Sequence, residues 1–449
     1  MIYVDVAVDN KSKYTDGLFT YKSPVDIRPG DLVTVPFGSG DREKKAIVCG
    51  TPTKIDCPSD KLKTISEVVE RGFLSEEAVK TAVWMKQRYG IKYHDAFRCF
   101  VPTGKAPKAG KEKEPYKGVS GKYVRPESLT PQQNLAVSEI VSAIKSGSQT
   151  SFLLHGVTAS GKTEVYMEMI DKVLSEGRQA IVLIPEIALT YQTVMRFYTR
   201  FGGRVSILNS RMSQGERYDQ MERVKKGEVD IMIGPRSALF TPFERLGLIV
   251  IDEEHEPTYK SEQVPRFHAR ETAIERARME GASVVLGSAT PSLEAFYACE
   301  CGRYQMLRLR NRTGKQALPE VYVADMREEL KHGNRSILSD RLKVLMQHRL
   351  EKKEQIMLFL NRRGYAGFVS CRACGYVVKC PHCDVSLSVH RGGKMVCHYC
   401  GYETQTVKNC PVCGSPYIGG FRAGTQQIED LVKREFPQAR VLRMDMDTT

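Results

Sequence analysis

One octapeptide constrains the fold of this chain more than any other feature. Residues 156–163 read Gly-Val-Thr-Ala-Ser-Gly-Lys-Thr and match the phosphate-loop pattern G-x-x-x-x-G-K-[ST] at every required position. The apolar run 151–154 before it predicts a buried strand, and residues 163–176 after it predict a helix closed by Gly177. A loop between a strand and a helix N-terminus turns its backbone N–H groups towards a polyphosphate. The sequence therefore predicts a nucleoside triphosphate site in an α/β fold.

The residues of this loop have separate expected tasks. Lys162 is expected to reach the β- and γ-phosphates, and the Thr163 hydroxyl is expected to ligate Mg²⁺. The candidate ATP-binding residues of the loop are Gly156, Val157, Thr158, Ala159, Ser160, Gly161, Lys162 and Thr163.

An acidic tetrapeptide follows a second apolar strand. Residues 248–251 are Leu-Ile-Val-Ile and lead directly into Asp-Glu-Glu-His. An apolar strand that ends in an acid is the arrangement that holds Mg²⁺ opposite a phosphate loop. Asp252 is expected to hold the metal through its water shell, and Glu253 is expected to orient and deprotonate the attacking water. The candidate catalytic residues are Lys162, Asp252, Glu253 and His255.

A third motif ends the strand predicted at 284–286. Residues 288–290 read Ser-Ala-Thr, and their small hydroxyl side chains are expected to link Asp252 and His255 to movement between lobes. In that order, the phosphate loop, Asp-Glu-x-His and Ser-Ala-Thr resemble the superfamily 2 helicases and translocases. The resemblance implies two RecA-like lobes that clamp ATP between them.

Charge and cysteine content narrow the class of protein further. The chain has 67 Lys and Arg against 53 Asp and Glu, a formal charge of +14, which favours a polyanionic partner. No run is long and apolar enough to cross a bilayer, and the N-terminus lacks the basic and apolar regions of an export signal. These features predict a cytoplasmic protein without membrane contact, in which the 13 cysteines stay reduced.

Four C-x-x-C pairs within one short span predict two zinc ions. Eight thiolates complete two tetrahedral Cys₄ shells, whereas a redox motif occurs once. A nested pairing and a sequential pairing divided at Val389 are both open, and we favour nesting because it closes the insert on its own base. His382, His390 and His398 are expected to be solvated neighbours. The candidate ligands are Cys371, Cys374, Cys380, Cys383, Cys397, Cys400, Cys410 and Cys413; the nested pairing places the middle four on one ion.

The order of apolar runs predicts the domain organisation. Alternating valines near the N-terminus and a helix at 76–89 predict a small β-rich domain. Alternation of strands and helices then predicts a parallel sheet covered on both faces. The expected divisions are 1–104 (DNA-binding β-rich domain), 105–126 (basic linker), 127–315 (ATP-binding lobe 1) and 316–449 (lobe 2, incomplete at its C-terminus), with a double zinc insert at 370–415. The strands predicted in lobe 1 are 152–154, 180–184, 205–208, 230–233, 248–251 and 283–286; lobe 2 has apolar runs at 321–323 and 355–360 and a strand-like run at 439–444.

A double zinc module inside the second lobe makes the chain resemble the bacterial replication-restart helicases of the primosomal protein N-prime family. The similarity extends over nearly all of the chain. The segments that carry it are 184–190 (Ile-Pro-Glu-Ile-Ala-Leu-Thr, motif Ia), 234–240 (Gly-Pro-Arg-Ser-Ala-Leu-Phe), 361–365 (Asn-Arg-Arg-Gly-Tyr, motif IV), 423–426 (Ala-Gly-Thr-Gln, motif V), 259–270 (an aromatic-rich loop) and 129–133 (a glutamine motif whose Gln133 is placed to read adenine).

The resemblance implies a fold and an activity. The fold is α/β, with two RecA-like doubly wound parallel-sheet lobes, a small N-terminal β-rich domain and a double zinc-ribbon insert in the second lobe. The implied activity is that of a monomeric, ATP-driven 3′-to-5′ DNA helicase that uses ATP, Mg²⁺ and two Zn²⁺. It would bind single-stranded and forked DNA at stalled forks and restart replication with primosome loader proteins, the replicative helicase and single-stranded DNA-binding protein.

The aromatic-rich loop is the expected DNA contact. Rings beside cationic side chains give a sequence-tolerant grip on single strands, through stacking and charge. The alternative is that the aromatic side chains are buried in lobe packing. The candidate nucleic-acid-binding residues are Tyr259, Lys260, Arg266, Phe267 and Arg270.

The chain also departs from the family pattern. Thr20 stands where the family has Asp in Phe-Asp-Tyr, Asn209 stands where it has His, and only the segment 105–125 occupies the place of a winged-helix domain. The motif VI arginines would lie beyond Thr449, so this chain alone is expected to bind nucleotide and to hydrolyse it poorly. Two other functions stay open: a fork-remodelling translocase that does not separate strands, and a zinc-ribbon nucleic-acid scaffold with a nucleotide switch. Strand displacement on forked DNA tests the first, and slow DNA-independent turnover would favour the second.

Overall fold

The structure is a computed structural model that describes residues 2–10, 12, 14–55, 58, 61–101, 125–185, 191–314, 319–360, 368–390, 393–420 and 425–444. The chain forms two compact units, Met1–Gln316 and Ala317–Thr449. Within the described residues, no helix combines the length and the apolar character that a membrane crossing requires. Residues 105–124 of the linker predicted at 105–126, most of motif Ia, motif IV and the first residues of motif V lie outside the described residues.

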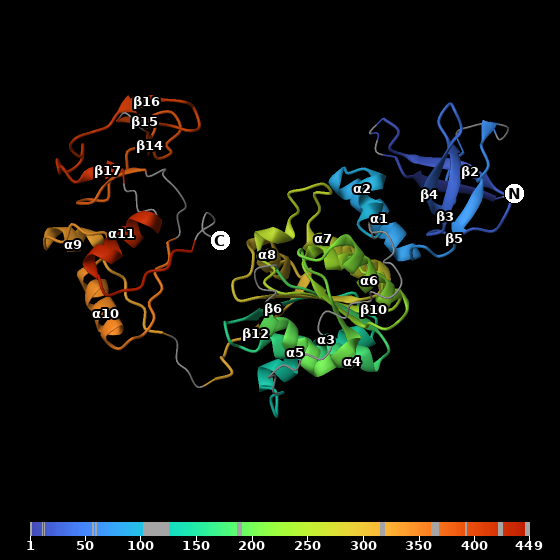
Figure 1. The fold of residues 1–449 in the computed structure, drawn as a ribbon, viewed down its shortest axis with the longest axis horizontal. Helices are drawn as coiled ribbons and strands as arrows, with labels where there is room; N and C mark the ends of the chain where they lie inside the picture. Colours follow the sequence, from blue (N-terminus) through green and yellow to red (C-terminus); the bar gives the residue numbers. More distant parts are fainter. Residues whose placement is uncertain are drawn as a thin grey trace. The chain divides into compact units, whose positions relative to one another are not determined.

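A five-stranded antiparallel sheet opens the first unit (Figure 1), with strand order β2-β1-β4-β3-β5. Alternate side chains of β1 and β3 are buried in one core, among them Val4, Val6, Val33 and Val35. Period-two burial of β-branched residues is what the sequence predicted here. The strands are β1 (Ile2–Val8), β2 (Leu18–Ser23), β3 (Leu32–Phe37), β4 (Arg42–Gly50) and β5 (Glu67–Glu70).

Two helices follow this sheet. Helix α1 (Glu76–Tyr89) has the bounds that the sequence predicted and is followed by α2 (Tyr93–Arg98). The Ser75 side chain accepts from the backbone N–H of Ala78, and Gly90 ends the helix with a φ of 62°. Apolar side chains of both helices share one core with the larger sheet that follows in the chain.

The larger sheet has seven strands, all parallel, in the order β12-β6-β11-β10-β7-β9-β8. All six strands predicted for lobe 1 are present, with ends within two residues of the expected positions. The strands are β6 (Ser151–Gly156), β7 (Gln179–Leu183), β8 (Val205–Ile207), β9 (Ile231–Gly234), β10 (Leu246–Ile251), β11 (Ser283–Ser288) and β12 (Tyr304–Leu309).

Helices cover both faces of this sheet (Figure 1). All six residues of β10 are buried, and they alternate between two cores: Val250 belongs to one, Ile249 and Ile251 to the other. A strand buried on both faces reads as a continuous apolar run, as residues 248–251 do. The parallel sheet covered on both faces, which the alternation of strands and helices predicted, is present. The helices α3 (Pro131–Lys145), α4 (Lys162–Ser175) and α5 (Tyr191–Phe201) lie on one face, and α6 (Gln214–Lys225), α7 (Ala269–Glu280) and α8 (Leu293–Glu300) on the other.

Strand β12 was not predicted. It pairs in parallel with β6 at the edge of the sheet, and only Leu307 and Leu309 of its six residues are buried. Exposed Gln305 and Arg308 break the apolar run that identified the central strands. An edge strand needs less apolar surface because only part of it is covered.

The described part of the second unit outside the zinc module contains three helices, α9 (Met326–Lys331), α10 (Asp340–Glu351) and α11 (Thr425–Glu435). Leu338, Met346, Ile428, Val432 and Phe436 form a core to which α10 and α11 contribute, whereas α9 has no buried residue. A parallel sheet of the second lobe is not among the described residues.

The strand expected at 439–444 is not formed. Exposure alternates along this run and along 355–360 as it does in a strand, and Ile356, Leu358 and Val441 pack against the helical core. No described segment pairs with either run through a backbone ladder. A period-two pattern states which side chains face a core, but a strand also needs a neighbour for its backbone.

The zinc insert is built from short strands. Strands β13 (Val369–Cys371) and β17 (Ile418–Gly420) pair at its base, and β14 (Ser388–Val389), β15 (Lys394–Val396) and β16 (Glu403–Gln405) form a small antiparallel sheet further out. The insert therefore begins and ends at the same strand pair, as the nested pairing expected.

Candidate ATPase site and zinc centres

The phosphate loop connects β6 to the N-terminus of α4. Ala159 and Gly161 have φ angles of 63° and 78°, which curl the backbone over the first turn of the helix. The side chain of Lys162 returns over the loop and its Nζ donates to the Gly156 carbonyl at 3.0 Å. A Cβ at Gly156 would lie 2.5 Å from the Ser160 Oγ, so this strand end has no space for a side chain. The local geometry is that of a phosphate-binding loop.

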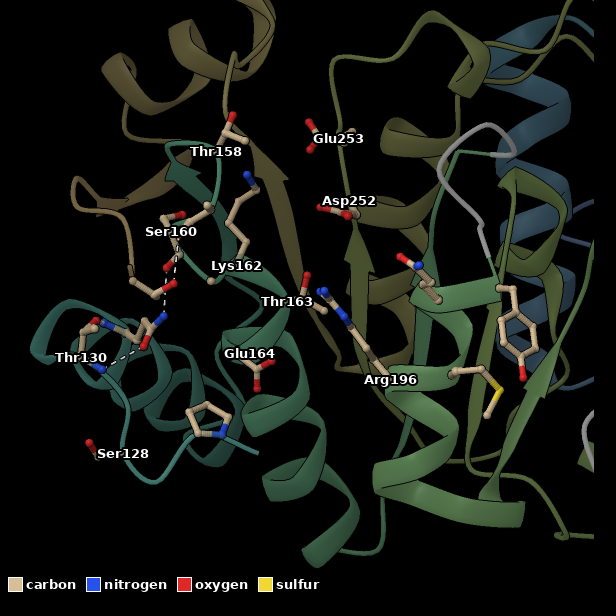
Figure 2. A pocket seen from close by; sticks show the side chains of 18 residues that line it. Ser128, Thr130, Thr158, Ser160, Lys162, Thr163, Glu164, Arg196, Asp252 and Glu253 are labelled. Atoms are coloured by element: carbon tan, nitrogen blue, oxygen red, sulfur yellow. Dashed lines mark hydrogen bonds between the residues drawn. The ribbon is translucent and has the colours of Figure 1, made fainter. Parts of the chain in front are cut away.

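The side chain of Gln133 is hydrogen-bonded to this loop. Its Oε1 accepts from the Thr130 backbone N–H at 2.8 Å, and its Nε2 donates to the Ser160 carbonyl at 2.9 Å (Figure 2). The Gln133 side chain is buried and also lies against Gly161, where a Cβ would come within 2.3 Å of its Nε2. In this structure the polar atoms of Gln133 are therefore engaged in holding the loop, which sequence reasoning had not anticipated.

The acidic turn follows β10, two strands away from β6. Asp252 continues the sheet, because its backbone N–H donates to the Leu183 carbonyl at 2.9 Å. Glu253 then takes a φ of 46°, a left-handed conformation that is uncommon for a residue with a side chain. Figure 2 shows Asp252 and Glu253 across the pocket from Lys162 and Thr163. Parallel strands present their carboxyl ends at one edge, which is why these distant segments meet.

One pocket of about 1050 Å³ contains both halves of the site. Its far wall is formed by α5, from which Arg196 extends towards Thr163 (Figure 2). Sequence reasoning missed this wall, because a helix surface residue carries no local signal of what it faces. The lining residues are Pro126, Ser128, Thr130, Gln133, Thr158, Ala159, Ser160, Gly161, Lys162, Thr163, Glu164, Tyr191, Gln192, Met195, Arg196, Asp252, Glu253 and Thr313.

The residues present fit a nucleotide with Mg²⁺. The Ser160 Oγ is buried and has no hydrogen-bond partner among the described residues, so the loop holds an unused polar atom at the place where a phosphate oxygen would bind. The carboxylates of Asp252 and Glu253 and the Thr163 hydroxyl are the hard oxygen ligands that suit Mg²⁺ and its water shell.

Asp252 is oriented by a tyrosine that sequence reasoning also missed. Tyr166 of α4 is buried, and its hydroxyl donates to Asp252 Oδ1 at 2.9 Å. Burial, and then the neighbouring charge of Glu253, raise the pKa of Asp252 above its usual value, while Tyr166 and Lys162 act in the opposite direction. The sequence signal that could have indicated this contact is Gly287, because a glycine inside a strand often marks a place where another group approaches the backbone closely. Here a Cβ at Gly287 would lie 1.6 Å from the Tyr166 hydroxyl.

His255 does not face the phosphate loop. Its Nδ1 lies 2.8 Å from the Ser288 Oγ, which also accepts from the Thr290 backbone N–H at 3.0 Å. The Ser-Ala-Thr motif is therefore joined directly to the acidic turn. The expected link between His255 and a small hydroxyl residue is present, whereas Asp252 has no recorded bond to that motif within the described residues.

The aromatic-rich loop corrects one sequence expectation. Tyr259 is 1% exposed, and its hydroxyl donates to the carbonyl oxygens of Asp252 at 2.7 Å and Leu183 at 3.0 Å. Phe267 is 5% exposed and packs edge-on against Phe240. Neither ring offers a face for stacking a base in this structure, and the alternative of burial in lobe packing holds for both.

The three cations of this loop divide into two groups. Arg270 is buried and forms an ion pair with Glu254, so it is not available to a phosphate. Lys260 and Arg266 are exposed, and the Lys260 Nζ donates to the Arg266 carbonyl at 2.9 Å and lies over the Tyr89 ring of the N-terminal domain. The structure thus leaves Lys260 and Arg266 as the surface cations of the loop.

The eight cysteines form two nested groups. In each group the sulfur atoms lie within 4.8 Å of one another, and three cross-pairs are separated by 3.5–3.6 Å. A tetrahedral zinc ion with Zn–S bonds of about 2.3 Å holds its sulfurs about 3.8 Å apart, so both groups fit Zn²⁺. The groups are Cys371, Cys374, Cys410 and Cys413, and Cys380, Cys383, Cys397 and Cys400.

All four C-x-x-C pairs use the same local turn. The residue after the second cysteine donates its backbone N–H to the carbonyl of the first cysteine at 2.9–3.0 Å and has a positive φ. Glycine meets that requirement without strain in three turns and aspartate does so in the fourth. The residues are Gly375, Asp384, Gly401 and Gly414.

Comparison with known proteins agrees with this geometry. The family model for DEAD/DEAH box helicases matches residues 130–297, a 3′DNA-binding domain model matches 5–102, and the model for the Cys-rich region of the PriA DNA helicase matches 380–404. Replication restart protein PriA of Bacillus subtilis is 49% identical over 338 residues, which cover 75% of this chain and 42% of the relative. That of Haemophilus influenzae is 34% identical over 508 residues, 96% of this chain and 69% of the relative.

A solved structure of RecG bound to a three-way DNA junction matches 68% of this chain and 43% of its own chain, at 18% identity and a TM-score of 0.33. The seven-stranded sheet, the phosphate loop and the acidic turn define the ATPase core of a DEAD/DEAH box helicase. The chain belongs to the replication restart protein PriA family. It spans less than half of the Bacillus subtilis relative and about two thirds of the Haemophilus influenzae one.

Proposed function

We propose that this chain is the motor part of an ATP-driven 3′-to-5′ DNA helicase that acts at stalled or branched replication forks. The observation that carries the proposal is that Lys162 and Thr163 of the phosphate loop share one pocket with Asp252 and Glu253. Family membership supports the biological setting, because the relatives are replication restart proteins.

The proposed roles of the pocket residues follow from charge and position. Lys162 binds the β- and γ-phosphates, and the loop backbone with the Ser160 hydroxyl encloses them. Thr163 and Asp252 hold Mg²⁺, which neutralises charge that develops on the transferred phosphoryl group. Glu253 orients and deprotonates the attacking water, and His255 connects this step to the Ser-Ala-Thr motif through Ser288. Gln133 reads adenine with the capacity that its two bonds to the loop leave over, the second lone pair of Oε1 and the second N–H of Nε2.

The domain division proposed for the motor is the one expected from sequence: a DNA-binding domain over 1–104, a linker to 126, lobe 1 over 127–315 and lobe 2 over 316–449 with its zinc insert at 370–415. The match of 5–102 to a 3′DNA-binding domain supports the first part. Lys260 and Arg266, which are exposed, are the proposed strand contacts of the aromatic-rich loop.

The proposed partners are single-stranded and forked DNA, primosome loader proteins, the replicative helicase and single-stranded DNA-binding protein. We also propose a cytoplasmic location, because restart of replication takes place where the chromosome is. The proposed monomeric state is the one expected from the sequence resemblance.

The decisive experiment measures ATP turnover of the full-length protein with and without forked DNA that carries a 3′ tail. Lys162→Ala is expected to lower the DNA-stimulated rate by at least about 10²-fold, because it removes a cation aimed at the transferred phosphate. Binding to the fork is expected to change little. Lys172→Ala is the matched control: it removes an exposed lysine from the same helix, outside the pocket. Unchanged turnover in Lys162→Ala would refute the helicase assignment.

A further inference from the structure

The third acid of the Asp-Glu-Glu-His turn is buried instead of facing the pocket. The Glu254 side chain is 0% exposed. One carboxylate oxygen accepts from Arg270 Nη1 at 2.8 Å and from the Ser292 hydroxyl at 3.0 Å, and the other accepts from the Ser292 backbone N–H at 2.7 Å. A carboxylate with three donors and no access to solvent is held in one position.

The partners of Glu254 belong to two helices. Arg270 lies in the first turn of α7, and its Nη1 also donates to the Ser292 Oγ at 2.7 Å. Ser292 is the N-cap of α8, where its Oγ accepts from the Ala295 backbone N–H at 3.2 Å. The network therefore fixes the acidic turn relative to α7 and to the helix that follows Ser-Ala-Thr.

A buried ion pair of this kind is a weak source of stability. Desolvation of two charges offsets most of their attraction, and an apolar pair of similar size often packs as well. The ion pair between Glu254 and Arg270 instead fixes the position of the turn, and the neighbouring Glu253 depends on that position. Glu253 sits at a φ of 46°, and the turn is pinned behind it by the bond from the Glu254 N–H to the Gly287 carbonyl at 3.0 Å.

The same turn of α7 also contacts the N-terminal domain. Glu271 accepts from Arg88 Nη2 at 3.1 Å and from the Tyr89 hydroxyl at 3.2 Å, both at the end of α1. Adjacent residues of one helical turn thus bind the hydrolysis turn on one side and the domain matched to a 3′DNA-binding module on the other.

We propose that Glu254 and Arg270 are positioning residues for hydrolysis: the pair holds the Asp252–His255 turn in the conformation that aims Glu253, and joins it to the helix on which the N-terminal domain rests. The proposal rests on the proposed ATPase function and names a device that serves it. It predicts that loss of the pair lowers kcat and leaves nucleotide affinity in place, since neither residue lines the pocket.

The choice of variants follows from the contacts. Arg270 uses a single nitrogen, Nη1, for both Glu254 and Ser292, so the Nζ of a lysine has the chemistry to replace it. Arg270→Lys is expected to keep kcat within about threefold, whereas Arg270→Met is expected to lose about tenfold or more. The double variant Glu254→Gln with Arg270→Met removes both charges, which avoids an unpaired buried charge and preserves folding.

The experiment compares these variants in the full-length protein for kcat and KM of ATP on forked DNA, affinity for a fluorescent non-hydrolysable ATP analogue, and thermal midpoint. The matched control is Arg278→Ala, which breaks the surface pair of Arg278 with Glu275 on the same helix. The neutral double variant is expected to melt near the wild-type temperature and bind the analogue normally, with kcat about tenfold lower. Wild-type kcat in that double variant would overturn the proposal, because it would make the pair purely structural. Absence of DNA-stimulated turnover in the wild type would instead refute the proposed function.

Discussion

Replacing Gly287 by alanine tests how the magnesium-binding acid is held. A Cβ at Gly287 would lie 1.6 Å from the Tyr166 hydroxyl oxygen and 2.8 Å from Cζ of that ring. Tyr166 is 1% exposed and packs in the core between the sheet and α4, so the ring has no free space to enter. The hydroxyl must therefore leave Asp252 Oδ1, to which it donates at 2.9 Å.

The magnitude follows from two separate costs. Overpacking in a filled core costs about 1–3 kcal/mol. Loss of a hydrogen bond to a carboxylate costs about 1.5–3 kcal/mol. Gly287→Ala is expected to incur both, Tyr166→Phe only the second. In the double variant the hydrogen bond is lost once and the closest atom becomes the ring Cζ, so the double variant is expected to cost at least about 1.5 kcal/mol less than the sum of the singles.

The assay is urea unfolding of the four proteins in a double-mutant cycle, together with the Mg²⁺ dependence of ATP turnover. Tyr166→Phe is expected to raise the Mg²⁺ concentration needed for half-maximal rate, because Asp252 loses the donor that orients it. Gly203→Ala is the control: among the described residues, nothing beyond the chain neighbours of Gly203 lies within 4 Å of the place that a Cβ would take there, so the change is expected to be near neutral. Additive single effects, or a Gly287→Ala protein as stable as the wild type, would refute the reasoning.

Five further predictions concern single side chains. Asp252→Asn is expected to raise the thermal midpoint of the nucleotide-free protein at pH 7–8, because burial raises the pKa of this carboxyl and the folded state holds its charge at a cost. The gain should shrink as pH falls through the raised pKa of Asp252 and vanish below the usual value of 3.8, as measured by melting curves across pH. Ser160→Ala is expected to leave the free energy of unfolding within about 0.5 kcal/mol and to weaken binding of a fluorescent nucleotide, because its buried hydroxyl has no partner among the described residues. Phe267→Ala is expected to cost about 3–5 kcal/mol in urea unfolding without altering the salt dependence of single-strand binding. Arg266→Ala is expected to leave the free energy of unfolding unchanged and to weaken the salt dependence of single-strand binding. The slope of log affinity against log salt concentration should become smaller in magnitude by about 0.7 for one phosphate that Arg266 neutralises, and a slope equal to that of the wild type would show that Arg266 does not contact the strand. Cys397→Ser is expected to lower zinc from two ions per chain to one by elemental analysis, since the outer cysteine group shares no ligand with the inner one.

Patterns that act over a few neighbouring residues were sufficient to predict much of this fold. The phosphate loop, helix α1 and the six central strands each have a local signature, and their bounds agree with expectation. The nested zinc pairing is different in kind. Its four turns were readable from C-x-x-C, but the choice between two pairings depends on how β13 and β17 close the insert, which is a tertiary fact.

The expectations that failed and the contacts that were missed all depend on tertiary structure, which a short stretch of sequence does not contain. Tyr259 and Phe267 have the composition of a stacking platform, and composition does not state which side of the backbone faces the core. The partners of Glu254 lie 16 and 38 residues away, so no local pattern connects them. The run at 439–444 has strand periodicity without a described neighbour to pair with.

Three of the four side chains of the acidic turn are held in place by hydrogen bonds. Asp252 is bound by the Tyr166 hydroxyl, Glu254 by Arg270 and Ser292, and His255 by Ser288. Glu253 is different: within the described part of the chain its carboxylate accepts no side-chain hydrogen bond, and the one basic group paired with it, His255 Nδ1, lies 3.6 Å away, beyond hydrogen-bond range. It is one-third exposed to the pocket that Lys162 lines. A general base must be free to accept a proton from water, and fixing its neighbours is how a strained backbone can present it without tying up its oxygens.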